Sequence, residues 1–328
     1  MRGVSGLHHV TAIAGPAQEN LDFYAGVLGM RLVKKSVNQD DPGTYHLFYA
    51  DARGTPGSDL TFFPWSIVAP RRDGHGVSVE VSLAVPAGSL AFWGRRFARY
   101  GVEASAIETR FGRPTLPFVD PHGLRAALVE SEGADRRRFE PWDGSPVPAA
   151  QQIRGLEGAR LVERELAPTT SFLSSVLGFL RVGAEDGWER WGVRDGTSGR
   201  YIDLHALPDA RRGAWGVGSI HHLAWRVDDE AHQQEVRERV EQAHRRPTPV
   251  IDRFWFKSVY FLEPGGVLFE LATDGPGFSV DEDPGHLGES LVLPPWLEPH
   301  RAAITSMVPP LHTPAAIEEK VGARARTL

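Results

Sequence analysis

The chain has 328 residues, of which 41% are hydrophobic and 24% charged, and this composition excludes a disordered or collagen-like protein. Its 36 lysines and arginines against 42 acidic residues give a net charge of −6, which argues against a nucleic-acid partner. Because cysteine is absent, disulfides, iron–sulfur clusters and cysteine zinc sites are excluded, and any metal must be bound by histidine and carboxylate.

The opening sequence MRGVSGLHHV enters a structured pattern at once and has no apolar core of the kind found in signal peptides. No apolar run in the chain reaches the roughly 18 residues of a membrane span. We therefore expect a cytoplasmic protein that has no membrane partner.

The predicted elements follow one order, a strand, a helix and then several short strands. In the first module this order predicts a strand at 8–14, a helix at 17–29 that ends on a glycine C-cap, and strands at 31–39, 45–50 and 59–65. Further modules begin with strands at 77–85, 159–165 and 221–227, and their helices are predicted at 89–101, 169–179 and 230–244. The pattern indicates four βαβββ modules.

Internal similarity supports this organisation. An offset of 149 residues places Val27-Leu28-Gly29 on Val176-Leu177-Gly178, and an offset of 213 places His8-His9 on His221-His222. We expect an α+β protein in which the modules pair into two domains of curved mixed β-sheet.

The segment 134–155, rich in charge and proline, reads as the linker between the halves. The predicted domains are 1–150 and 151–328, each with two modules. Beyond Thr273 the sequence becomes irregular, and we expect this part to wrap over other structure as a lid. The segment 316–328 reads as a short surface helix of unknown role.

Two histidine pairs and one glutamate carry the chemistry. Neighbouring side chains on a strand point to opposite faces, so only one histidine of each pair can face a given cavity. If modules one and four pair, their first strands bring one histidine from each to the same cavity. Glu270 fits as the third ligand, because a carboxylate within an apolar strand is costly unless it is paired or binds a metal. Two histidines and one carboxylate with open positions are typical of non-haem Fe(II) oxygenases.

The repeat also indicates how many such sites to expect. The offset of 149 places Glu157 and Gly158 where the first module has His8 and His9, and alignment of the closing strands places Ala127 where the fourth module has Glu270. Modules two and three therefore lack the triad, and we expect one metal site. The other histidines have no assigned role: His46, His75, His122, His205, His232, His244, His286, His300 and His312.

The motifs HHVT, HHLAWRV and FELATDGPGF resemble the vicinal oxygen chelate superfamily. Within it the chain is similar to ring-cleaving dioxygenases that act on hydroquinones, and the likeness covers nearly the whole chain, including residues 15–35 and the segment LPPWLE. The resemblance implies the vicinal oxygen chelate fold, an Fe(II) cofactor with Mn(II) as the other candidate ion, and a hydroquinone-like or catechol-like small aromatic substrate that reacts with O2.

The resemblance also assigns roles to individual residues. It implies that the metal ligands are His9, His222 and Glu270. It places His8, His221 and Thr11 behind these ligands, and it places Arg253 and Tyr260 in the substrate pocket. His8, His221 or Tyr260 would move protons, and Arg253 would stabilise negative charge that develops on oxygen.

Two other functions stay open at this point. One is a glyoxalase-like lyase or isomerase, in which the metal polarises an oxygen. Such sites often use a second glutamate, whereas the first module has Phe63 at the position expected to match Glu270. The other is a non-catalytic protein of the same fold that binds an aromatic compound or a drug, with structural histidines. The sequence leaves the ring substituents and the pairing with a second copy undetermined.

Overall fold

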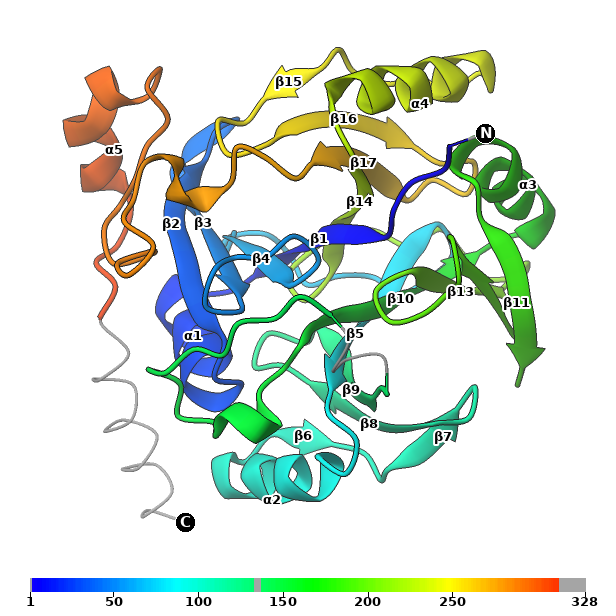
Figure 1. Cartoon of the computed structure of the whole chain (residues 1–328), viewed down its shortest axis with the longest axis horizontal. Helices are drawn as coiled ribbons and strands as arrows, with labels where there is room; N and C mark the ends of the chain where they lie inside the picture. The colour runs from blue at the N-terminus through cyan, green and yellow to red at the C-terminus, as the bar shows by residue number, and fades with distance from the viewer. Residues whose placement is uncertain (1, 133–136, 313–328) are drawn as a thin grey trace.

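The computed structural model describes residues 2–132 and 137–312, and the predicted helix at 316–328 lies outside them. Two mixed sheets form the molecule, with the helices on their outer sides (Figure 1). The first sheet has the strand order β15 (Ile251–Asp252), β16 (Lys257–Leu262), β17 (Leu268–Thr273), β14 (Ile220–Val227), β1 (Leu7–Ala14), β4 (Asp59–Pro64), β3 (Asp41–Ala50) and β2 (Arg31–Asn38). The second has β11 (Leu180–Glu185), β12 (Trp188–Gly192), β13 (Tyr201–Ala206), β10 (Gly155–Glu163), β5 (Val77–Val85), β9 (Arg125–Glu130), β8 (Arg113–Val119) and β6 (Glu103–Ala104), and β7 (Glu108–Arg110) pairs with β8.

The modules pair in a nested way. Module one joins module four through the antiparallel strands β1 and β14, and module two joins module three through β5 and β10. The expected α+β architecture of four paired modules is confirmed, and so is the meeting of the first strands of modules one and four. Each sheet takes one module from either side of residue 150, and the division of the chain into domains at that residue stays a prediction.

The helices lie where the hydrophobic periodicity predicts them. Helix α2 spans Leu90–Tyr100 and α4 spans Glu230–Gln242. In modules one and three the helix widens into a π-helical turn, since α1 (Ala17–Leu21) continues as Asp22–Val27 and α3 (Leu166–Phe172) continues as Leu173–Leu177. The same irregularity in both modules shows that the internal repeat extends to backbone detail. Among the described residues no helix is long and apolar enough to cross a membrane.

Strand alternation gives the first sheet one core face and one concave face. Val10, Leu223 and Leu271 point into the main hydrophobic core between the sheet and its helices. Ala224 and Phe48, on the opposite face, belong to a second apolar cluster. The concave face also receives the functional side chains that sequence analysis places on these strands.

The segment after Thr273 packs against the outer edge of the first sheet. Leu291 forms a β-bridge with Lys35 of β2, and Arg31 donates hydrogen bonds to the carbonyls of Pro284 and Gly285. Helix α5 (Arg301–Met307) lies beside β3 (Figure 1). As far as residue 312 this segment packs over the edge of the first sheet, and its role as a lid stays a prediction.

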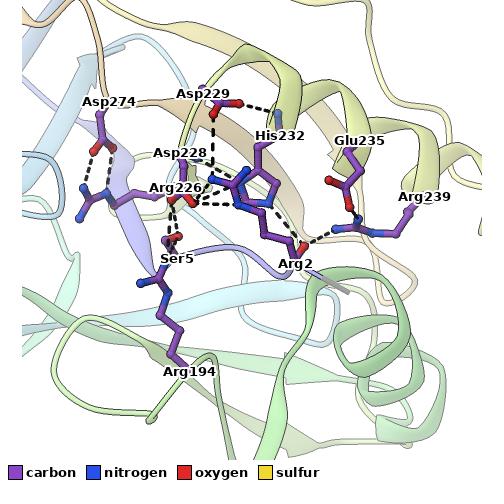
Figure 2. Close-up of polar contacts among 10 residues, drawn as sticks. All are labelled: Arg2, Ser5, Arg194, Arg226, Asp228, Asp229, His232, Glu235, Arg239 and Asp274. Atoms are coloured by element: carbon purple, nitrogen blue, oxygen red, sulfur yellow. Dashed lines mark hydrogen bonds and ion pairs between the residues drawn. The ribbon is translucent and has the colours of Figure 1, made fainter.

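Polar contacts fix the start of the chain against module four (Figure 2). Arg2 and Ser5 donate hydrogen bonds to the carboxylate of Asp228, the latter over 2.7 Å, and Arg239 of α4 donates to the carbonyl of Arg2 over 2.7 Å. Arg194 reaches Ser5 from module three. Because Asp228 directly follows β14, these contacts hold the entry to β1 in register with its partner strand.

A buried carboxylate pair lies where the two sheets meet. Glu163 ends β10 and Glu263 follows β16, and both are completely buried. The Glu263 carboxylate accepts hydrogen bonds from Thr169 and from the backbone of Val267, whereas neither oxygen of Glu163 has a hydrogen-bond partner among the described residues. Burial, followed by the charge of Glu263, raises the pKa of Glu163 to about 9.

This raised pKa predicts a pH-dependent stability. The folded protein holds the Glu163 proton up to about pH 9, whereas the unfolded chain releases it near the ordinary pKa of glutamate. The contribution of protonated Glu163 to the free energy of unfolding is therefore complete in acid and is lost as pH rises toward 9. Glu163→Gln should therefore resemble the wild type at pH 5 and have the higher melting temperature at pH 9. Calorimetry across this range, with the exposed Glu165→Gln as control, measures the effect. An unchanged pH dependence in Glu163→Gln would contradict the assignment.

Candidate metal centre and active site

Three buried side chains converge on the concave face of the first sheet. His9 comes from β1, His222 from β14 and Glu270 from β17, and each is at most 3% exposed. The Nε2 atoms of the histidines are 3.2 Å apart, and Glu270 Oε2 lies 3.2 Å from His9 Nε2 and 3.0 Å from His222 Nε2. Residues separated by 213 positions in sequence thus contribute ligand atoms to one point.

The strand register explains how both histidines of each pair reach this region. Opposite β14, Leu7 pairs with Trp225 and His9 with Ala224, so His8 is an extra residue in a β-bulge. Further along, Thr11 pairs with His222 and Ala12 with Ile220, which makes His221 the extra residue on β14. The bulges bring His8 and His221 beside the inner histidines, while one histidine of each pair, His9 or His222, lines the pocket.

The bulged histidines hold the two inner ones from behind. His8 Nδ1 lies 2.9 Å from His9 Nδ1, and His221 Nδ1 lies 2.8 Å from His222 Nδ1. Burial lowers the pKa of His8 well below its ordinary value and that of His221 to about 3, so both rings are neutral acceptors. A proton on the inner Nδ1 can then be donated to the outer ring, which leaves each inner Nε2 with a free lone pair.

Glu270 is held by a side chain that the sequence did not single out. Ser258 Oγ, on β16, donates to Glu270 Oε1 over 2.5 Å. Burial alone would raise the pKa of Glu270, but the close contact with the imidazoles of His9 and His222 outweighs it and holds the pKa well below its usual range. Glu270 is therefore an ionised carboxylate whose buried Oε2 faces two imidazole nitrogens.

This arrangement fits a divalent transition metal. Two imidazole lone pairs and a carboxylate oxygen that meet in a dry site need a cation between them. Mutually cis ligands at about 2.1 Å from one ion lie about 3.0 Å apart, which matches the spacing of the three atoms. Nitrogen and oxygen donors of this kind suit Fe(II), Mn(II) and Zn(II).

A pocket opens beside the three ligand atoms. Arg253 lies at its edge, where the guanidinium forms hydrogen bonds of 3.2 and 2.8 Å with the carboxylate of Asp40 and lies 5.4 Å from the centre of the Tyr260 ring. Burial, then the charge of Glu270, raises the pKa of Tyr260, so its phenol stays protonated. The residues that line the pocket are His9, Asn38, Gln39, Asp40, His46, Phe48, Phe63, His222, Arg253, Trp255, Phe256 and Tyr260.

The structure separates the predicted site residues into two groups. Arg253 and Tyr260 line the pocket with His9 and His222, while Glu270 is completely buried between these histidines. His8, His221 and Thr11 do not belong to the lining. Thr11 is buried and hydrogen-bonded over 2.7 Å to Thr61 of β4, while the His221 ring stacks on Trp215 with their centres 4.5 Å apart.

The register corrects one expectation about the equivalent of Glu270. Glu270 pairs with Ala224, and the offset of 213 makes Ala224 equivalent to Thr11, whose partner on β4 is Thr61. Thr61, two residues before Phe63, therefore occupies the position that matches Glu270, and the alignment on Phe63 was wrong. The symmetric position carries a hydroxyl in place of a second carboxylate.

The equivalent region of the second sheet carries different residues. Arg160 pairs with Glu80 as Thr11 pairs with His222, so Glu80 occupies the place of His222. Gly158 occupies the place of His9, where a Cβ atom would lie 2.4 Å from the Tyr201 ring, and Ala127 that of Glu270.

Ion pairs fill this second concave face. Arg190 forms a two-pronged interaction with Asp203 at 2.7 and 2.9 Å, and Arg160 lies 3.5 Å from the same carboxylate. Glu80 is paired with Arg110 at 2.6 Å. Charged side chains that neutralise one another thus occupy the space that the first sheet leaves as a pocket.

Comparison with known proteins identifies relatives of the chain. Residues 6–128 and 156–271 match the family model of the Glyoxalase/Bleomycin resistance protein/Dioxygenase superfamily. The chain is 43% identical to the “Putative ring-cleaving dioxygenase MhqO” of Bacillus subtilis, over 91% of this chain and 94% of that protein. It is 32% identical to the chlorohydroquinone/hydroquinone 1,2-dioxygenase of Sphingobium indicum, over 90% and 93% of the two chains.

Solved structures agree with this placement. A crystal structure of a Bacillus subtilis relative, 40% identical, superposes with a TM-score of 0.87 over 95% of this chain and 99% of that one. Maize glyoxalase I, at 14% identity, superposes with a TM-score of 0.59 over 82% and 92%, which reflects a common fold. The family model matches most of the chain, its relatives align over nearly their whole length, and the βαβββ modules pair as described above. The chain therefore belongs to the glyoxalase, bleomycin resistance protein and dioxygenase superfamily.

Proposed function

We propose that the protein is a non-haem Fe(II)-dependent ring-cleaving dioxygenase that acts on hydroquinone-like or catechol-like aromatic compounds with O2. The observation that carries the proposal is the convergence of His9, His222 and Glu270 at the wall of an aromatic pocket. Relatives named as ring-cleaving and hydroquinone dioxygenases support the enzyme class and the choice of substrate. Cytoplasmic location stays a prediction, and the oligomeric state stays open.

The metal would be held by the two inner histidines and Glu270, with His8, His221 and Ser258 orienting them. Ferrous iron held by these residues would supply the redox chemistry with O2 that ring opening requires. Mn(II) is the other ion that this donor set accommodates.

The pocket walls determine what can lie beside the metal. Phe48, Phe63 and Trp255 present apolar surfaces that suit a planar ring and exclude water. Thr61 stands where a second carboxylate would complete a four-ligand site, so the pocket side of the centre stays free of a further acidic ligand. This arrangement leaves space for an aromatic substrate and O2 beside His9 and His222.

Arg253 and Tyr260 supply the charge and the proton of the pocket. The Arg253 guanidinium, fixed by Asp40, presents positive charge where a reacting oxygen gains electron density. Tyr260 stays protonated and can donate a hydrogen bond to such an oxygen. His8 and His221 are placed to orient ligands, and we assign the proton-transfer role to Tyr260 in preference to them.

The experiment is oxygen uptake by protein loaded anaerobically with Fe(II) and offered methylhydroquinone, chlorohydroquinone and catechol in parallel. Metal content per chain is measured on the same sample, and a second sample is loaded with Mn(II). We expect one metal per chain and oxygen consumption with the hydroquinones. One metal without oxygen consumption would contradict the dioxygenase and favour a lyase or isomerase. Aromatic binding without any bound metal would favour a binding protein.

A further inference from the structure

One histidine of the pocket has no role in the function proposed above. His46 lies on β3, in phase with Phe48 and opposite in direction to the core residues Tyr45 and Leu47. Its side chain lines the same pocket as His9 and His222. Because β4 lies between β3 and β1, His46 is two strand spacings, about 10 Å of sheet, from the strand that carries His9.

The surroundings of His46 fix its ring and leave one nitrogen available. Nε2 is hydrogen-bonded over 2.9 Å to Thr61 Oγ1, which is in turn 2.7 Å from Thr11 Oγ1. The ring lies between Phe48 and Phe63, with centre distances of 3.9 and 4.4 Å. Nδ1 has no hydrogen-bond partner among the residues that the structure describes, and the residue is partly accessible.

The ring is also neutral. Burial is the main cause that holds the pKa of His46 well below its ordinary value. A neutral imidazole offers one hydrogen-bonding nitrogen to the pocket without adding charge. The aromatic walls and this single polar atom together resemble a site that orients a planar polar ligand.

We propose that His46 determines substrate specificity by hydrogen-bonding the ring hydroxyl that lies para to the oxygen held at the metal centre. The proposal rests on the proposed function, because it takes the metal centre as the anchor of the first oxygen. A para-diol carries its two oxygens at opposite ends of the ring, so its second oxygen must find a partner across the pocket. In a catechol the oxygens are on adjacent carbons, and both lie at the metal side, away from His46.

The test compares two ligands that differ only in the para hydroxyl. Anaerobic calorimetry of the Fe(II)-loaded protein measures the dissociation constants of hydroquinone and phenol. We expect the wild type to bind hydroquinone about tenfold more tightly, because a site built to bond a hydroxyl penalises the analogue that lacks it. His46→Phe should bind both ligands alike, and His46→Gln, which keeps a hydrogen-bonding group, should retain part of the preference.

Two features make the outcome specific. His46→Leu repeats the test with a smaller apolar side chain, and iron content must equal that of the wild type in each variant. His300→Phe, at an exposed histidine outside the pocket, is the matched control and should keep the full preference.

Equal affinity of the wild type for hydroquinone and phenol would overturn the proposal, as would a preference that survives in His46→Phe or His46→Leu. The dissociation constants of the wild type and of the variants are both measured without turnover. A protein that binds hydroquinone with the expected preference but consumes no oxygen would contradict the dioxygenase and leave the role of His46 intact.

Discussion

Replacement of Glu270 by alanine should abolish metal retention and, with it, oxygen consumption. The substitution removes the only negative charge among the three converging ligands and leaves two neutral imidazoles in a buried site. His9→Ala and His222→Ala should have the same effect, because each leaves two ligands. Metal content after anaerobic loading and desalting measures the result directly.

A second readout does not depend on activity. A metal that binds only the folded state at 100 times its dissociation constant adds about 2.7 kcal/mol of stability. Iron should therefore raise the melting temperature of the wild type and leave that of Glu270→Ala unchanged. His300→Ala should behave as the wild type. Iron content equal to that of the wild type in all three ligand variants would show that the metal centre lies elsewhere.

Replacement of Asp203 by alanine should destabilise the second sheet more than almost any other single change there. Asp203 is 1% exposed and receives both prongs of the Arg190 guanidinium, with Arg160 close by. Loss of the carboxylate leaves the buried Arg190 guanidinium without its counter-charge, whereas Arg160 keeps Glu80 at 3.9 Å, and breaking a buried pair such as Arg190–Asp203 costs about 3–5 kcal/mol. Urea unfolding measures this loss of stability as a lower midpoint, with the slope of free energy against urea concentration unchanged.

The chain provides a matched control for this prediction. Asp195 accepts a hydrogen bond of 2.8 Å from Arg200 at the surface, so Asp195→Ala removes the same kind of pair in high dielectric and should cost roughly 0–1 kcal/mol. Similar losses in Asp203→Ala and Asp195→Ala would show that the second sheet does not depend on its internal ion pairs.

Much of the fold could be predicted because the spacing of hydrophobic residues shows the repeat. Strand alternation, helical periodicity and the recurrence of the histidine pair are local or periodic signals, and together they indicate which modules meet. The convergence of the ligands follows from that pairing once Glu270 is recognised as a charge in an apolar strand.

The details that tune the site depend on register, which the sequence does not display. The bulges at His8 and His221 place each outer histidine against the ring of its inner neighbour, and the residue types at these positions do not indicate a bulge. In the sequence Ser258 is one serine among others, and only the pairing of β16 with β17 places its hydroxyl beside Glu270. His46 could have been found from its alternation with Phe48 in the strand at 45–50, but only the curvature of the sheet shows that this face reaches the metal centre.

The nested pairing of the modules also sets an order in time. During synthesis the second sheet has all its strands once residue 206 has been made, whereas the first sheet, which begins with β1, is complete only when β17 ends at residue 273. His9 is among the first residues translated and its strand pairs with β4 of the same module, but the residues that converge with it, His222 and Glu270, come more than 200 positions later. Metal binding at the proposed centre is therefore a late event in the maturation of the protein, because a chain that ends before residue 270 lacks the Glu270 carboxylate.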